Sequence, residues 1–407
     1  MNMLTLARKS LLNRRFTLSL TLLSIAISLM MLLGVERLQQ QIKTSFTQTI
    51  SGTDLIVGAR TGQLNLLLYS VFGMGDPTNN ISWQSYQQIA ELKDVAWTVP
   101  ISLGDSHQGY RVVGTEPGYF EHRRYANKTP LEFVEGQAFA DENQLVLGAE
   151  VAQKLAYQLG DELVLSHGVA KISFSHHQGH PFVVSGILQR TGTPIDQRLF
   201  VNLAAIDHMH ESSPHHMNED EHQHGGISAF YLGAKSKFTL LTLLRDINEF
   251  EAEPLLAILP QVALQQLWQL MSMVEKGLML LAILVVVTGL IGMLTNILTN
   301  LTQRQREMAI LRAIGAAPRH IFMLLMGETA LLALLGCLFG VVLFFVAQWG
   351  LLPVIQQQLG MKLVITGVTS AEWKLLGLVF IASLLLGLVP AIRAYRMTLH
   401  DGMQMRG

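Results

Sequence analysis

Four stretches of the chain are apolar, nearly free of charge and long enough to cross a membrane. Residues 16–35 form an uncharged run of 20, and a helix of that length, rising about 1.5 Å per residue, spans about 30 Å of hydrocarbon. Three more runs follow only after a long gap, at 277–301, 321–350 and 375–392. The pattern predicts one membrane helix, a large soluble segment, and then three further membrane helices.

The first apolar run has an alternative interpretation as a signal peptide, because four basic residues at positions 8, 9, 14 and 15 precede it. However, the run is longer than the 7–15 residues typical of a signal peptide core. Residues 34–37 also lack the small-residue pattern of a cleavage site. We therefore expect an uncleaved anchor.

Basic residues beside the apolar runs predict the orientation of the chain. They gather before the first run, between the second and third, and after the fourth, so these segments are expected to be cytoplasmic. The predicted order is a cytoplasmic N-terminus (1–15), first span (16–35), periplasmic domain (36–270), second span (277–301), cytoplasmic loop (302–320), third span (321–350), short periplasmic loop (351–374), fourth span (375–392) and cytoplasmic tail (393–407). This places the protein in a bacterial inner membrane.

The segment 36–270 mixes polar and apolar residues as a globular domain does. Alternation at 110–114 and 182–187 predicts strands, and amphipathic spacing predicts helices at 82–92, where Ser82 caps the first turn, and at 237–250. These elements predict an α+β domain, and its length favours two subdomains. Polar helical stretches at both ends, 38–49 and 261–274, are expected to continue the adjoining spans as stalks.

Composition excludes several classes of function. Half of the residues are hydrophobic and 14% are charged, and the net charge of −1 provides no basic field for nucleic acid. The single cysteine, Cys337, excludes an intramolecular disulfide framework and any CxxC site. No G-x-x-x-x-G-K-[ST] motif occurs, so the chain is not expected to hydrolyse ATP or to be an enzyme.

A histidine-rich segment at 207–224 is the clearest candidate for metal binding. Imidazoles and carboxylates are ligands for Zn²⁺ and similar ions, and His-x-His spacing lets neighbouring side chains reach one ion. The candidate ligands are His208, His210, His215, His216, His222 and His224, with a weaker cluster at His176, His177 and His180. No H-E-x-x-H is present, so we expect transient zinc capture rather than a catalytic metal, and no cofactor that the chain must hold. The alternative is a solvated insertion without a function of its own.

The loop between the second and third runs contains a short amphipathic pattern, with apolar residues at 308, 310, 311 and 314 and a helix-ending Gly315. Taken alone, it is typical of an interfacial helix that anchors the loop. The string 304–328 resembles the coupling segment of the MacB/FtsX-like permeases, the mechanotransmission class of ABC transporters. Residues 142–162 and 389–394 resemble the same family's periplasmic core and the end of its last helix.

The resemblance implies an α-helical membrane protein with four transmembrane helices and an inserted α+β periplasmic domain of the MacB-like core type. It further implies a separate ABC ATPase subunit, a second permease copy, identical or not, and contacts with membrane lipids. By position, the residues expected to couple to the ATPase are Arg304, Arg306, Glu307, Leu311, Arg312 and Gly315. ATP would then act only through the partner subunit.

The expected function is therefore that of a permease subunit that turns ATP hydrolysis into conformational work on a periplasmic protein or substrate, with a link to zinc or another transition metal. Two alternatives share the architecture. One is extraction or export of a lipoprotein, lipid or peptide, with the histidine-rich segment incidental. The other is activation of an external cell-wall hydrolase, as FtsX-like proteins do.

Overall fold

The computed structural model describes residues 15–167, 181–206, 226–303, 317–359 and 365–400. It divides into two compact units, each with its own internal packing. A membrane unit comprises 1–41, 273–354 and 364–407, and a soluble unit comprises 42–272 with 355–363. The division falls inside three continuous helices, so the chain passes from one unit to the other within each of them.

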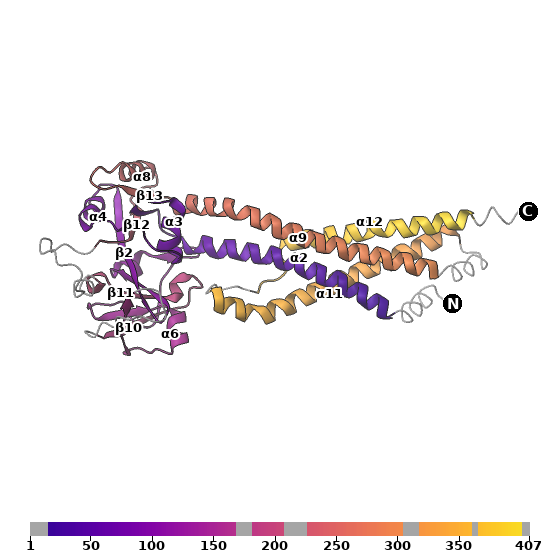
Figure 1. Cartoon of the computed structure of the whole chain (residues 1–407), viewed down its shortest axis with the longest axis horizontal. Coiled ribbons are helices and arrows are strands. Elements are labelled where there is room, and N and C mark those ends of the chain that lie inside the picture. The colour runs from indigo at the N-terminus through magenta and orange to yellow at the C-terminus, as the bar shows by residue number, and fades with distance from the viewer. Residues whose placement is uncertain (1–14, 168–180, 207–225, 304–316, 360–364, 401–407) are drawn as a thin grey trace, which may run out of the picture. The chain divides into compact units, whose positions relative to one another are not determined.

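Among the described residues, four helices are long and apolar enough to cross a membrane, which confirms the predicted one-plus-three arrangement. They are α2 (Arg15–Thr49), α9 (Pro260–Gln303), α11 (Pro318–Leu359) and α12 (Ser370–His400) (Figure 1). At about 1.5 Å per residue, the 44 residues of α9 extend over about 66 Å, more than twice the hydrocarbon thickness. The surplus in α2 and α9 forms the two helical stalks expected from the sequence.

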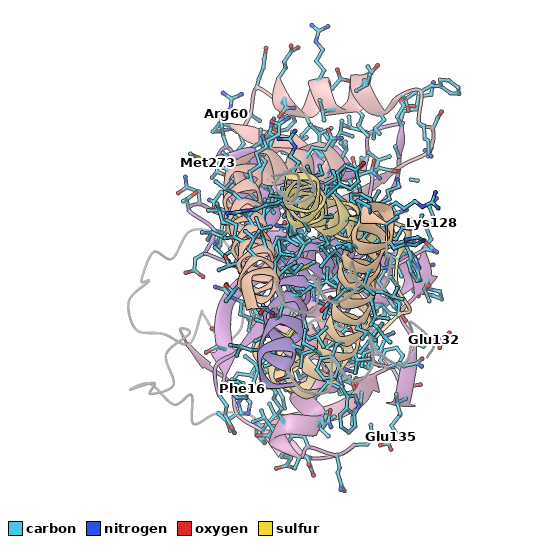
Figure 2. All side chains as sticks on the ribbon, turned by 90° about the vertical axis from the view of Figure 1, so that its right-hand side faces the viewer. Phe16, Arg60, Lys128, Glu132, Glu135 and Met273 are labelled. Carbon is cyan, nitrogen blue, oxygen red and sulfur yellow. The ribbon has the colours of Figure 1, made fainter. Side chains whose placement is uncertain are left out.

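The helices of the membrane unit lie side by side when viewed along the bundle (Figure 2). Small residues bring α2 close to its neighbours: the position of a Cβ on Gly289 of α9 lies 2.6 Å from the Ser28 hydroxyl, and one on Gly336 of α11 lies 2.8 Å from Ile25. The Ser28 hydroxyl also donates to the Val285 carbonyl at 3.0 Å. Such close backbone approach is the usual way in which membrane helices associate without a hydrophobic driving force.

We predict that replacing Gly340 with Ala destabilises this bundle by about 1–3 kcal/mol, the usual cost of overpacking. The added methyl would lie 2.8 Å from Leu29 Cδ2 and 3.0 Å from Leu29 Cβ, so α2 and α11 must separate. Gly292→Ala is the matched control, since a Cβ there meets nothing within 4 Å. Thermal unfolding in detergent measures both variants, and equal melting temperatures would contradict the packing described.

The soluble unit is built on one 11-stranded mixed sheet with the order β13-β1-β12-β2-β3-β11-β7-β10-β6, and with β8 and β9 paired to β10 and β2. The strands are β1 (Leu55–Ala59), β2 (Val95–His107), β3 (Tyr110–Thr115), β6 (Phe133–Gly136), β7 (Gln144–Leu147), β8 (Glu162–Leu163), β9 (Ser166–His167), β10 (Phe182–Leu188), β11 (Arg198–Asn202), β12 (Ala229–Ala234) and β13 (Leu255–Ile258). A separate hairpin pairs β4 (Arg124–Tyr125) with β5 (Thr129–Pro130). One sheet runs through the described part of this unit, and the expectation of two subdomains stays a prediction.

Short helices and turns complete the soluble unit. They are α3 (Gln63–Leu67), the π-helical turn η1 (Leu68–Phe72), α4 (Trp83–Ala90), α5 (Gly118–His122), α6 (Ala149–Leu155), the 3₁₀ turn η2 (Pro194–Gln197) and α8 (Leu240–Asn248). The predicted cap of α4 is confirmed, since the backbone N–H of Ser85 donates to the Ser82 hydroxyl. The predicted strands at 110–114 and 182–187 correspond to β3 and β10.

Candidate functional site

The sequence-predicted site residues lie outside the described part of the chain. This holds for the coupling residues Arg304, Arg306, Glu307, Leu311, Arg312 and Gly315, and for all nine candidate histidines in 176–180 and 208–224. Within the described residues, no group of three or more His, Cys, Asp or Glu side chains is placed to hold a metal ion. These predictions therefore stay predictions. The structure describes the parts of the chain that adjoin these residues.

The helix ends on either side of residues 304–316, where the sequence predicts a coupling helix, share one apolar cluster with the end of the last helix; it is here called the coupling-end cluster. It joins Leu301 of α9, Ile321 and Leu325 of α11, and Ala391 and Ala394 of α12, all buried. At the start of α11, the Ala317 backbone N–H donates to His320 Nδ1 at 3.1 Å. The ends of α9, α11 and α12 are thus packed together.

At the other end of the membrane unit, a buried ion pair joins α2 to α12. Arg37 Nε donates to Glu372 Oε1 at 2.5 Å and Arg37 Nη2 donates to Glu372 Oε2 at 2.6 Å, which is a bidentate pair. The two residues are 3% and 0% exposed. Because burial removes both charges from water, the pair is stable only if the remaining donors and acceptors are also satisfied.

The rest of this site supplies those partners. Arg37 Nη1 donates to the Thr366 carbonyl at 3.1 Å and to its hydroxyl at 2.6 Å, and Nη2 donates to the Gly367 carbonyl at 2.9 Å. The Phe344 ring of α11 lies 5.6 Å from the guanidinium carbon. Thr369 and Glu372 form a reciprocal capping box at the start of α12, with hydrogen bonds of 2.8 and 3.4 Å. We call this arrangement the Arg37–Glu372 clamp.

A second buried arginine fixes the end of the α2 stalk within the soluble unit. Arg123 Nη2 donates to the Thr49 carbonyl at 2.6 Å, and Nη1 donates to the Thr53 hydroxyl at 2.9 Å. A cation at a helix C-terminus interacts favourably with the helix dipole and satisfies carbonyls that have no partner within the helix. The guanidinium also lies 4.9 Å from the centre of the Tyr231 ring.

Aromatic side chains hold both stalks in the same core. Phe46 of α2 lies 4.4 Å from Phe72 and 5.5 Å from Trp268 of α9, measured between ring centres. Buried Tyr119 belongs to this core, and burial raises its pKa to about 12 although the nearby arginines oppose the shift. The phenol is therefore neutral at physiological pH and plays no acid–base role. The stalk ends are thus packed into the core of the soluble unit.

The two buried arginines thus fix α2 at two places. One continuous helix, α2, is clamped to α12 within the membrane unit and capped by Arg123 within the soluble unit. Sequence analysis missed both arginines. A usable signal existed only for Glu372, the partner of Arg37, since Thr369-x-x-Glu372 before an apolar run is a capping-box pattern.

Models of two protein families match this chain, and together their matches include residues of both units. The model of the MacB-like periplasmic core domain matches residues 18–247, more than half of the chain. The model of the FtsX-like permease C-terminal region matches residues 279–399. Among curated proteins, none matches this chain.

Two solved structures resemble part of the chain. The periplasmic region of MacB from Actinobacillus actinomycetemcomitans is 10% identical, with a TM-score of 0.36, over 54% of this chain and 94% of that one. The extracellular domain of the noncanonic ABC-type transporter YknZ from Gram-positive bacteria is 13% identical, with a TM-score of 0.33, over 51% of this chain and 99% of that one. Both TM-scores are low, so the assignment of the chain to a family rests on the two family models.

Proposed function

Because the chain belongs to the MacB/FtsX-like ABC transporter permeases, we propose that it couples ATP hydrolysis by a separate ATPase subunit to movement of its soluble domain. The observation that carries this proposal is the pair of rigid attachments on α2, at Arg37 and at Thr49. A helix fixed in both units transfers a displacement of one to the other.

The proposed path begins at residues 303–316, which bind the ATPase through Arg304, Arg306, Glu307 and Arg312. Both chain termini and this segment lie in the cytoplasm, in line with the basic residues that flank the spans. The soluble unit then lies in the periplasm. A second permease copy completes the complex, since the ATPase subunits of such transporters act in pairs.

The proposal is tested by purifying the full-length chain with its cognate ABC ATPase in lipid nanodiscs. The ATPase should co-purify, and its hydrolysis rate should depend on the permease. An ATPase that neither associates with the chain nor changes its rate would contradict the proposed function. The chain alone should hydrolyse no ATP.

The histidine-rich segment supports a metal link as a second element of the proposal. We predict that the full-length chain in detergent binds Zn²⁺ with micromolar or tighter affinity, because six imidazoles and five carboxylates lie within 207–224. Titration calorimetry measures this binding. A variant with the six histidines from 208 to 224 changed to Ser should lose it. Weak binding by the parent chain would favour lipoprotein, lipid or cell-wall partners instead.

A further inference from the structure

Helix α12 touches both ends of the proposed path. Glu372 near its start belongs to the Arg37–Glu372 clamp, and Ala391 and Ala394 near its other end belong to the coupling-end cluster. The 23 residues from 372 to 394 extend over about 33 Å as a helix, at about 1.5 Å for each step between them. α12 therefore connects the helix ends beside residues 304–316 to the base of the α2 stalk.

The described structure makes α12 resistant to sliding along its neighbour. A Cβ on Gly387 would overlap Thr329 Cγ2, so the Thr329 side chain of α11 lies directly against the backbone of α12 at that point. The one proline of the helix, Pro390, lies one residue before the coupling-end cluster. From Glu372 to Val389 the helix has no proline at which to bend.

The clamp is also unsuited to opening. All five N–H donors of Arg37 have acceptors: two on the Glu372 carboxylate, two on Thr366 and one on Gly367. Separating the pair would leave two charges in a site that excludes water, each without its partner. A contact that costs so much to break is expected to persist while other contacts rearrange.

From this geometry we propose that Arg37 and Glu372 are positioning residues that keep α2 and α12 joined throughout the ATPase cycle. Movement of α12 is then transmitted through this ion pair to the α2 stalk. The proposal rests on the proposed function, since it specifies how movement reaches the soluble unit. The Arg37–Glu372 ion pair stays formed during the cycle and does not open and close.

The test uses the full-length chain with its cognate ATPase in nanodiscs, in a Cys337→Ala background. Arg37→Cys and Glu372→Cys are introduced together and studied either reduced or bridged by a short bis-methanethiosulfonate. The readout is the ATP-dependent change in amide hydrogen exchange of residues 42–50, the end of the stalk, measured together with ATP hydrolysis. Leu38→Cys with Trp373→Cys is the matched control, one residue along each helix.

The reduced variant should still hydrolyse ATP but lose most of the ATP-dependent change in the stalk, and bridging should restore that change. The control pair should behave as the parent complex does. Arg37→Met with Glu372→Met should behave as the reduced cysteine pair does. This variant removes the ion pair without cross-linking, so it tests the proposal even if bridging of the cysteines is incomplete.

Three outcomes would overturn the proposal. A reduced or methionine variant with a parental stalk response would show that the pair transmits nothing. A response present when reduced and blocked by bridging would show that the pair must open. A parent complex that hydrolyses ATP without any change in the hydrogen exchange of residues 42–50 would contradict the proposed function itself. It would also contradict the transmission of movement through α12.

Discussion

Replacing Arg37 alone with Ala is expected to destabilise the membrane unit by about 3–5 kcal/mol, the cost of breaking a buried ion pair from one side. Glu372 would keep its charge in a site that is 0% exposed, and Thr366 and Gly367 would lose their donors. Since many domains have a total stability of only about 5–15 kcal/mol, this loss is a large share of the whole and should lower the melting temperature clearly.

Thermal unfolding in detergent, followed by tryptophan fluorescence, measures this loss. Trp373 follows Glu372 directly and is 64% exposed, so its emission reports on the start of α12. The double variant Arg37→Met with Glu372→Met is the matched control, because two apolar side chains leave no buried charge and should cost far less. Equal stability of the single variant and the parent chain would contradict a buried, paired Arg37.

Changing Glu307 and Arg312 to Ala together is expected to uncouple ATP hydrolysis from movement of the soluble unit. Central charged residues of protein interfaces often contribute about 2 kcal/mol, so even one such loss weakens the contact with the ATPase by about 30-fold. The basis is the resemblance of residues 304–328 to a coupling segment. Membrane insertion should be unaffected, since neither residue lies in an apolar run.

Co-purification with the ATPase and its hydrolysis rate measure this effect. Arg319→Ala is the control, because Arg319 is exposed at the start of α11 and lies beyond residues 303–316. The control should retain parental association and rate. If the Glu307/Arg312 variant also retains both, these residues have no coupling role.

Elements governed by local patterns could be predicted from the sequence. The four long helices follow from uncharged apolar runs, and β3 and β10 follow from alternation of buried and exposed positions. The Ser82 cap depends only on residues within one turn. The stalk helices at 38–49 and 261–274 continue their spans without a helix-breaking residue inside them.

Contacts between distant parts of the chain could not be predicted in the same way. Arg37 and Glu372 are 335 residues apart, and Arg37 follows the first apolar run as an ordinary flanking charge would. Arg123 caps a helix that ends 74 residues earlier. The order of the sheet, with β1 between β12 and β13, likewise depends on pairings that no local pattern encodes.

The most direct test of the central claim is a distance measured between the two units while ATP binds. Spin labels at Phe238→Cys in the soluble unit and Trp349→Cys in the membrane unit, positions 96% and 78% exposed, suit a Cys337→Ala background. In the complete complex, the account predicts that the distribution of distances between the labels shifts when ATP binds. A complex that hydrolyses ATP while this distribution stays unchanged would contradict it.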